Sequence, residues 1–154
     1  MEDEGKKYCE IIDDYLPFNH TYFKMRNEIE ASESFMGLAI AEGVRVNEIR
    51  EFLDMLDTLY SGISDREVRL DEFKEKRLKF TEEGWYDLKE KCNNGDKRAM
   101  YLFLSHFHIE NAVNDLMDLK KDTRFSERIE DDTITYMGKL SEAIIREALG
   151  YVRI

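Results

Sequence analysis

Apolar side chains recur every three or four residues along most of the chain, which is the spacing of one face of an α-helix. We find no segment with the period-two alternation that is typical of a strand. The apolar stripes and the capping residues between them predict six helices. They cover residues up to 16, then 20–42, 47–62, 65–91, 96–121 and 126–149.

The breaks between these segments carry residues that end or begin helices. Pro17 ends the first segment, because proline cannot continue a helix. Gly43, Gly62 and Gly150 close three others, and Asp96 is a typical N-cap. Four of the segments hold 23–27 residues, or roughly 35–40 Å at the helical rise.

Short connections make successive helices antiparallel neighbours. We therefore expect an all-α fold, an up-and-down helical bundle of four long helices plus two shorter helices. Neither a linker nor an internal repeat is evident, so residues 1–154 should form a single helical-bundle domain.

Within this pattern, Glu33 stands out because it interrupts an apolar stripe made by Ile29, Met36 and Ile40. A buried carboxylate without a partner would cost several kcal/mol. The chain should therefore supply a partner from another helix.

Two other stripes are interrupted in the same way, by Arg77 and by His106, and Tyr136 brings a hydroxyl to a third. Each of these residues lies near the middle of its predicted helix, and antiparallel helices hold their midpoints at one height. We expect Glu33, Arg77, His106 and Tyr136 to form a buried polar belt, with Glu33 within bonding distance of Arg77 or His106. Such a layer either fixes the register of the helices or lines a small pocket for a polar ligand.

The pattern also bears on metal chemistry. A ferritin-like di-metal centre needs Glu-x-x-His on two helices, and no glutamate here has a histidine three positions later.

The acids Glu30 and Glu33, then Glu51 and Asp54, form an ExxE…ExxD pattern across one helix–turn–helix. This pattern resembles the signature of the all-α nucleoside triphosphate pyrophosphohydrolases, the MazG-like group. The resemblance implies that the four carboxylates bind Mg²⁺ and position a nucleotide's phosphates. On the helical wheel, however, Glu51 and Asp54 point away from their helix's apolar stripe, so a second subunit would have to supply the facing wall.

Charge and composition narrow the classes of partner. Hydrophobic residues make up 42% of the 154 residues, charged residues make up 37%, and the net charge is −11. The densest basic stretch, KEKRLK at 74–79, is flanked by acids. These features argue against a general binder of nucleic acid or anionic membranes, because phosphate binding needs clustered Lys and Arg.

Cys9 and Cys92 have no metal-ligand spacing and are typical of reduced thiols. No apolar run approaches the roughly 20 residues of a membrane span, and the charged start lacks a signal-peptide core. We expect a soluble, cytoplasmic protein.

The stretch AMYLFLSHF at 99–107 is apolar nearly all round. Its helix should be either the central helix of the bundle or part of a subunit interface. We therefore expect a homo-oligomer that acts as a structural or protein-interaction module without a cofactor. The magnesium-dependent pyrophosphohydrolase is the alternative.

Overall fold

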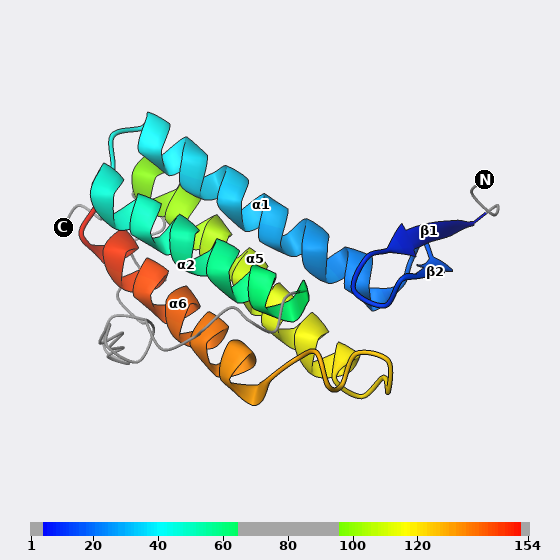
Figure 1. Cartoon of the computed structure of the whole chain (residues 1–154). Coiled ribbons are helices and arrows are strands. Elements are labelled where there is room, and N and C mark those ends of the chain that lie inside the picture. Colours follow the sequence, from blue (N-terminus) through cyan, green and yellow to red (C-terminus); the bar gives the residue numbers. More distant parts are fainter. Residues whose placement is uncertain (1–4, 65–95, 152–154) are drawn as a thin grey trace.

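The structure is a computed structural model that describes residues 5–64 and 96–151. Its described part contains a two-stranded hairpin and four helices (Figure 1). The elements are β1 (Lys6–Cys9), β2 (Asp14–Pro17), α1 (Thr21–Ala41), α2 (Val46–Ser64), α5 (Lys97–Leu119) and α6 (Asp131–Leu149).

The four helices form a bundle in which each contacts two neighbours. α1 packs along α5, α5 along α6, α6 along α2, and α2 closes the ring against α1. Helices that touch run in opposite directions, whereas α2 and α5, on one diagonal, run the same way (Figure 1). The mostly helical, all-α prediction is confirmed.

The turn between α1 and α2 follows from the glycine that the sequence places there. Gly43 has a φ of 93°, a left-handed conformation that glycine adopts without steric cost. The N–H of Val44 bonds to the Ala39 carbonyl, and the N–H of Gly43 bonds to the Ile40 carbonyl. This is a Schellman motif, which satisfies the last carbonyls of a helix. It returns α2 alongside α1.

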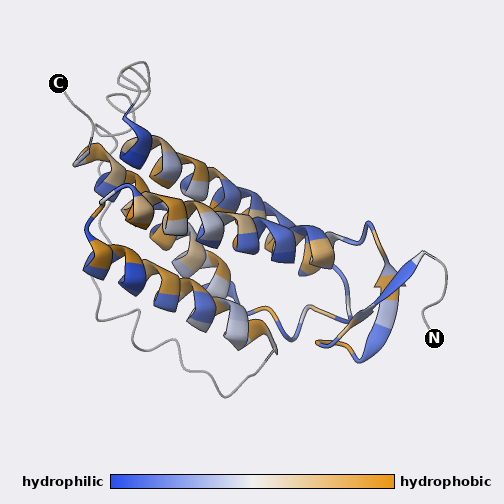
Figure 2. Ribbon diagram, turned by 90° about the horizontal axis from the view of Figure 1, so that it is seen from above, coloured by the Kyte–Doolittle hydropathy of each residue, from blue (hydrophilic) through white to orange (hydrophobic). Residues whose placement is uncertain are grey.

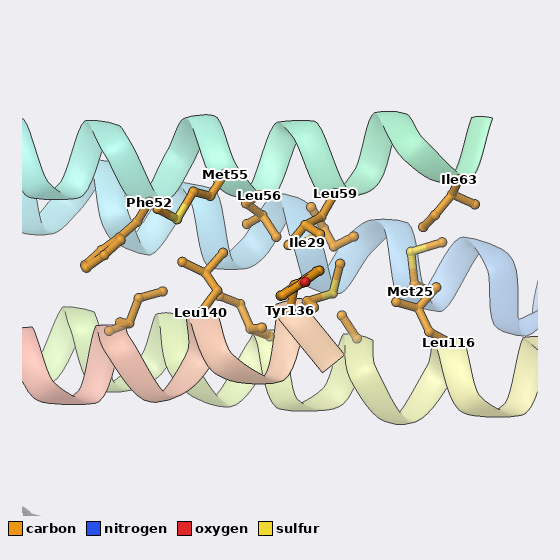
Figure 3. Close-up of a cluster of buried hydrophobic side chains, with 14 of the residues drawn as sticks. Met25, Ile29, Phe52, Met55, Leu56, Leu59, Ile63, Leu116, Tyr136 and Leu140 are labelled. Atoms are coloured by element: carbon orange, nitrogen blue, oxygen red, sulfur yellow. The ribbon is translucent and has the colours of Figure 1, made fainter. Parts of the chain in front are cut away.

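The core lies between the four helices and is built from the apolar stripes. Figure 3 shows Leu56 and Leu59 of α2 pointing toward Ile29 of α1 and toward Tyr136 and Leu140 of α6. All five are buried, and each buried aliphatic side chain contributes about 1.5–3 kcal/mol.

The prediction of a helix over the first 16 residues is wrong, because this segment is an antiparallel hairpin. Tyr8 pairs with Tyr15, and Cys9 pairs with Asp14, across a loop at residues 10–13. Asp13 in the loop has a φ of 49°, which aspartate tolerates better than most residues. A short isolated helix is marginal in water, whereas the hairpin buries Cys9 and Leu16 against the bundle.

The count of four long helices plus two shorter ones also needs correction. The second predicted short helix, 47–62, is α2, a helix of 19 residues that forms one side of the bundle. The predicted helix at 65–91 lies outside the described residues. The last helix begins at Asp131 rather than near residue 126, because residues 122–129 form separate turns that bury Phe125 and Ile129.

Two further observations concern the outside of the helices. On α5, Leu104 and Phe107 remain exposed in the single chain, whereas the sequence predicts that this stretch is buried on every side, either within the bundle or at a subunit interface. Among the helices of the described ranges, none is long and apolar enough to cross a membrane.

Candidate functional site

Glu33 lies at the edge of the core on α1, and its carboxyl group meets that of Asp57 on α2. Burial, the hydrogen bond with Asp57, and the negative charges of Asp57 and Glu30 raise the pKa of Glu33 to about 7. Two carboxyl groups this close favour a state in which one of them keeps its proton. The protonated Glu33 then donates to the Asp57 carboxylate. Within residues 5–64 and 96–151, the partner that the structure gives to Glu33 is therefore an acid, Asp57.

His106 is buried on α5 and is bonded to α6. Its Nδ1 lies 2.6 Å from the hydroxyl oxygen of Ser141 and 3.2 Å from the carbonyl oxygen of the same residue. The Ser141 hydroxyl lies 2.8 Å from Oε1 of Glu110. These contacts link two helices through a histidine, a serine and a carboxylate.

The direction of the protons follows from the partners of His106. A carbonyl oxygen can only accept, so Nδ1 carries the proton and donates to Ser141. The Ser141 hydroxyl is then left to donate to Glu110. Burial lowers the pKa of His106 despite the opposing charge of Glu110, so the ring is neutral at neutral pH. A nucleophilic serine needs a histidine nitrogen that accepts its proton, and Nδ1 here does the opposite. The arrangement is suited to joining α5 to α6.

One more polar contact lies next to these residues in the sequence. The hydroxyl oxygens of Ser32 on α1 and Ser105 on α5 are 2.7 Å apart, and both residues are buried. Their bond places Glu33 and His106, the residues that follow them, at a similar height in the bundle.

The remaining members of the predicted belt are Tyr136 and Arg77. Tyr136 is buried, and it lies near Ile29 and Leu59 (Figure 3). Arg77 lies outside the described residues, so its pairing with Glu33 stays a prediction.

The four acids of the MazG-like pattern are not brought together. Glu30, Glu51 and Asp54 are exposed, and Glu33 is bonded to Asp57 instead. Over residues 5–64 and 96–151, no group of three or more His, Cys, Asp or Glu side chains is placed to hold a metal ion. The acid of α2 that approaches Glu33 is Asp57, which is not one of the four acids of the pattern.

The hairpin forms a second polar and aromatic surface, beyond the end of the bundle (Figures 1 and 2). Its inner face buries Cys9 and Leu16. Its outer face carries Tyr8 and Tyr15, whose rings meet edge to face at 5.6 Å. The Tyr8 hydroxyl donates to Asp13 in the loop, which holds the ring across the hairpin.

Several of these residues were missed by sequence reasoning. Ser32 falls three residues after Ile29 and four before Met36, so a serine within an apolar stripe was a usable signal. Asp57 gave no such signal, because its approach to Glu33 depends on how far α2 is offset along α1. The hairpin was missed because its strands are four residues long, too short for alternation to stand out.

Comparison with known proteins gives a family but no activity. A family profile described as "Domain of unknown function (DUF1940)" matches residues 8–150, from the second half of β1 to the end of α6. None of the curated proteins matches the sequence.

Proposed function

The chain belongs to the DUF1940 family, and we propose from its structure that it is a self-associating interaction module that uses the N-terminal hairpin as its contact surface. The observation that carries this proposal is a group of three aromatic side chains exposed on or beside the hairpin. Tyr8 is 43% exposed, Tyr15 is 39% exposed and Phe18 is 55% exposed.

Two physical arguments connect this observation with association. Exposed apolar surface costs about 25 cal/mol for each Å² left in water, and contiguous patches of it mark interaction sites. A two-stranded hairpin is also marginal by itself, and added strands would stabilise this one beyond the packing of Cys9 and Leu16 against the bundle. A partner that covers Tyr8, Tyr15 and Phe18 would relieve both costs.

We propose a protein partner, a second copy of the chain, rather than a nucleic acid or an anionic membrane. The net charge of −11 opposes binding to phosphate-rich surfaces. A cytoplasmic setting is part of this proposal, because Cys9 is a free, buried thiol, and thiols stay reduced in that compartment.

Sedimentation equilibrium tests the proposal. The wild-type protein should have an average mass above the 18.3 kDa of one chain at tens of micromolar, and the mass should rise with concentration. Phe18→Ser should lower it. Leu38→Ser, which changes a side chain on α1 that is 43% exposed, is the matched control and should leave it unchanged. A mass of one chain at all concentrations would refute self-association.

A magnesium-dependent nucleoside triphosphate pyrophosphohydrolase is the second candidate. It is supported by the approach of Glu33, one of the four acids of the MazG-like pattern, to Asp57 on the facing helix, because such a site needs acids of two adjacent helices to meet, although Asp57 is not itself one of the four. If it is correct, nucleotide and Mg²⁺ together raise the melting temperature, and Glu33→Gln and Asp54→Asn each abolish hydrolysis with the fold intact. The absence of pyrophosphate release from a full set of nucleoside triphosphates, with magnesium or manganese present, would refute this second candidate.

A further inference from the structure

The two edges of the hairpin differ in the backbone groups that they offer. The Phe18 N–H bonds to the Gly5 carbonyl at 3.1 Å, which fixes the alternation of the ladder. Lys7 and Cys9 of β1 therefore bond inward to β2. The N–H and C=O groups of Lys6 and Tyr8 point outward.

The outer edge of β2 has no donor left for another strand. Its outward positions are Tyr15 and Pro17, which lie opposite Tyr8 and Lys6. Pro17 has no N–H. The N–H of Tyr15 already donates to the Asp14 carboxylate at 2.7 Å. Proline and charge are devices that natural sheets use to block an edge.

The outer edge of β1 is open by comparison. The N–H groups of Lys6 and Tyr8 have no backbone partner within the described part of the chain. Both side chains are exposed, so neither is held under the bundle. Of the two edges, β1 is the one that can take a further strand.

We propose that β1 pairs antiparallel with β1 of a second copy, about a two-fold axis that places Tyr8 opposite Tyr8 of that copy. The result is a continuous four-stranded sheet with β1 strands at its centre. This inference rests on the proposed self-association and adds its surface, direction and register.

The register follows from symmetry and charge. In a two-fold antiparallel pair, outward-pointing residues must bond to outward-pointing residues, which leaves registers centred on Lys7, Tyr8 or Cys9. Centring on Lys7 would oppose two lysines at the closest type of pair, and like charges opposite each other destabilise a sheet. Centring on Cys9 would place Lys6 opposite residue 12, beyond the end of β1, so Lys6 would have no strand residue of the second copy to pair with. Centring on Tyr8 sets Lys6 against Glu10 of the second copy, the turn residue that directly follows β1, and Glu10 against its Lys6.

The side chains of Lys6 and Glu10 suit that pairing. Both are exposed, and neither forms an ion pair within the described ranges. Lys6 lies on the same face of β1 as Tyr8, since side chains alternate along a strand. The pairing would therefore produce a row of tyrosines, Tyr15 and Tyr8 from each copy, with an ion pair on either side.

The contact is small. Two strands of four residues bury less than the roughly 1,600 Å² of a standard interface. We expect a reversible dimer with a dissociation constant in the micromolar range.

Charge reversal tests the register. Because the axis is two-fold, Lys6→Glu creates two like-charge pairs with Glu10, and Glu10→Lys creates two with Lys6. Each should weaken dimerisation about tenfold. The double variant Lys6→Glu/Glu10→Lys exchanges the charges and should return the dissociation constant to near the wild-type value.

Lys7→Glu is the matched control, because it changes the net charge by the same amount. Lys7 lies on the other face of β1, with its ammonium group 5.5 Å from the centre of the Phe23 ring, and in this register it opposes Cys9. The dissociation constant of the Lys7→Glu dimer should change by much less than that of the Lys6→Glu dimer. Circular dichroism of each variant checks that the fold is kept.

Each outcome decides between the two proposals. If the wild-type protein is a monomer, the proposed function fails, and the inference fails with it. If the wild type associates but Lys6→Glu behaves like Lys7→Glu, or the double variant is not rescued, self-association stands and the β1 pairing is overturned. Rescue by the double variant supports both.

Discussion

At the scale of single residues, the structure gives Glu33 an acidic neighbour that the sequence did not predict. Its neighbour across the helices is Asp57, and burial together with this second acid raises its pKa to about 7. Such a group takes up a proton more readily in the folded chain than in the unfolded chain. It therefore links the stability of the bundle to pH.

The sign of that linkage is fixed. Between the unfolded pKa of 4.5 and the folded pKa of about 7, the folded state binds more protons at Glu33, so its contribution to the free energy of unfolding falls as pH rises. Glu33→Gln removes the titratable group, and with it this fall in the free energy of unfolding. The variant should gain most over the wild type near pH 8 and little or nothing near pH 4, by urea denaturation.

Glu30→Gln is the control for this prediction, because Glu30 is exposed one helical turn away and should have a smaller effect. A Glu33→Gln variant that is less stable than the wild type near pH 8 would contradict the acid pair. It would point instead to a cationic partner, such as the Arg77 expected from the sequence.

At the scale of elements, short polar contacts join helices that are otherwise held by apolar packing. The bond between Ser32 and Ser105 joins α1 to α5, and the contacts of Ser141 with His106 and Glu110 join α5 to α6. Each polar group in the core favours the one register in which it is paired.

The serine pair gives a prediction for the α1–α5 contact. Ser32→Ala leaves the buried Ser105 hydroxyl without this partner, which should cost about 1–3 kcal/mol. Replacing both serines by alanine should cost less than the sum of the single changes. Denaturant unfolding of the two single variants and the double variant measures the difference.

Ser34→Ala is the matched control on the same helix. Ser34 is exposed, and its hydroxyl bonds to the Glu30 carbonyl of its own turn, so its loss should stay within about 0.5 kcal/mol. Additive costs for Ser32 and Ser105 would show that their hydroxyls do not act as a pair.

The helices and the hairpin also show which elements could be predicted from the sequence. The segment 47–62 was predicted within two residues of α2, because its apolar stripe, bounded by Gly43 and Gly62, is a local signal. The first segment was misassigned because the spacing of Tyr8, Ile11 and Tyr15 fits a helix as well as it fits a hairpin. What decides between them is burial against the bundle, which no local pattern contains.

Less of the candidate site than of the fold could be predicted from the sequence. His106 was singled out because it interrupts an apolar stripe, and it is buried with polar partners. Its partner Ser141 depends on the rotation of α6 about its own axis, and Asp57 depends on the offset between α1 and α2. Both are tertiary quantities, set by how the side chains of all four helices pack.

At the scale of the whole molecule, the four-helix bundle carries a hairpin whose aromatic face and β1 edge are not covered by the described residues. The net charge of −11 opposes close approach of two copies. Association therefore needs a local contact that offsets this repulsion, and pairing of Lys6 with Glu10 of a second copy supplies opposite charges where the strands meet.

Amide hydrogen exchange, measured by NMR at increasing protein concentration, tests the β1 pairing most directly. The outward amides of Lys6 and Tyr8 should exchange more slowly as the concentration rises. Those of Lys7 and Cys9, which already bond to β2, and that of Tyr15, which donates to Asp14, should change little. Exchange at Lys6 and Tyr8 that stays fast and independent of concentration, in a sample that sedimentation shows to be associated, would contradict the account.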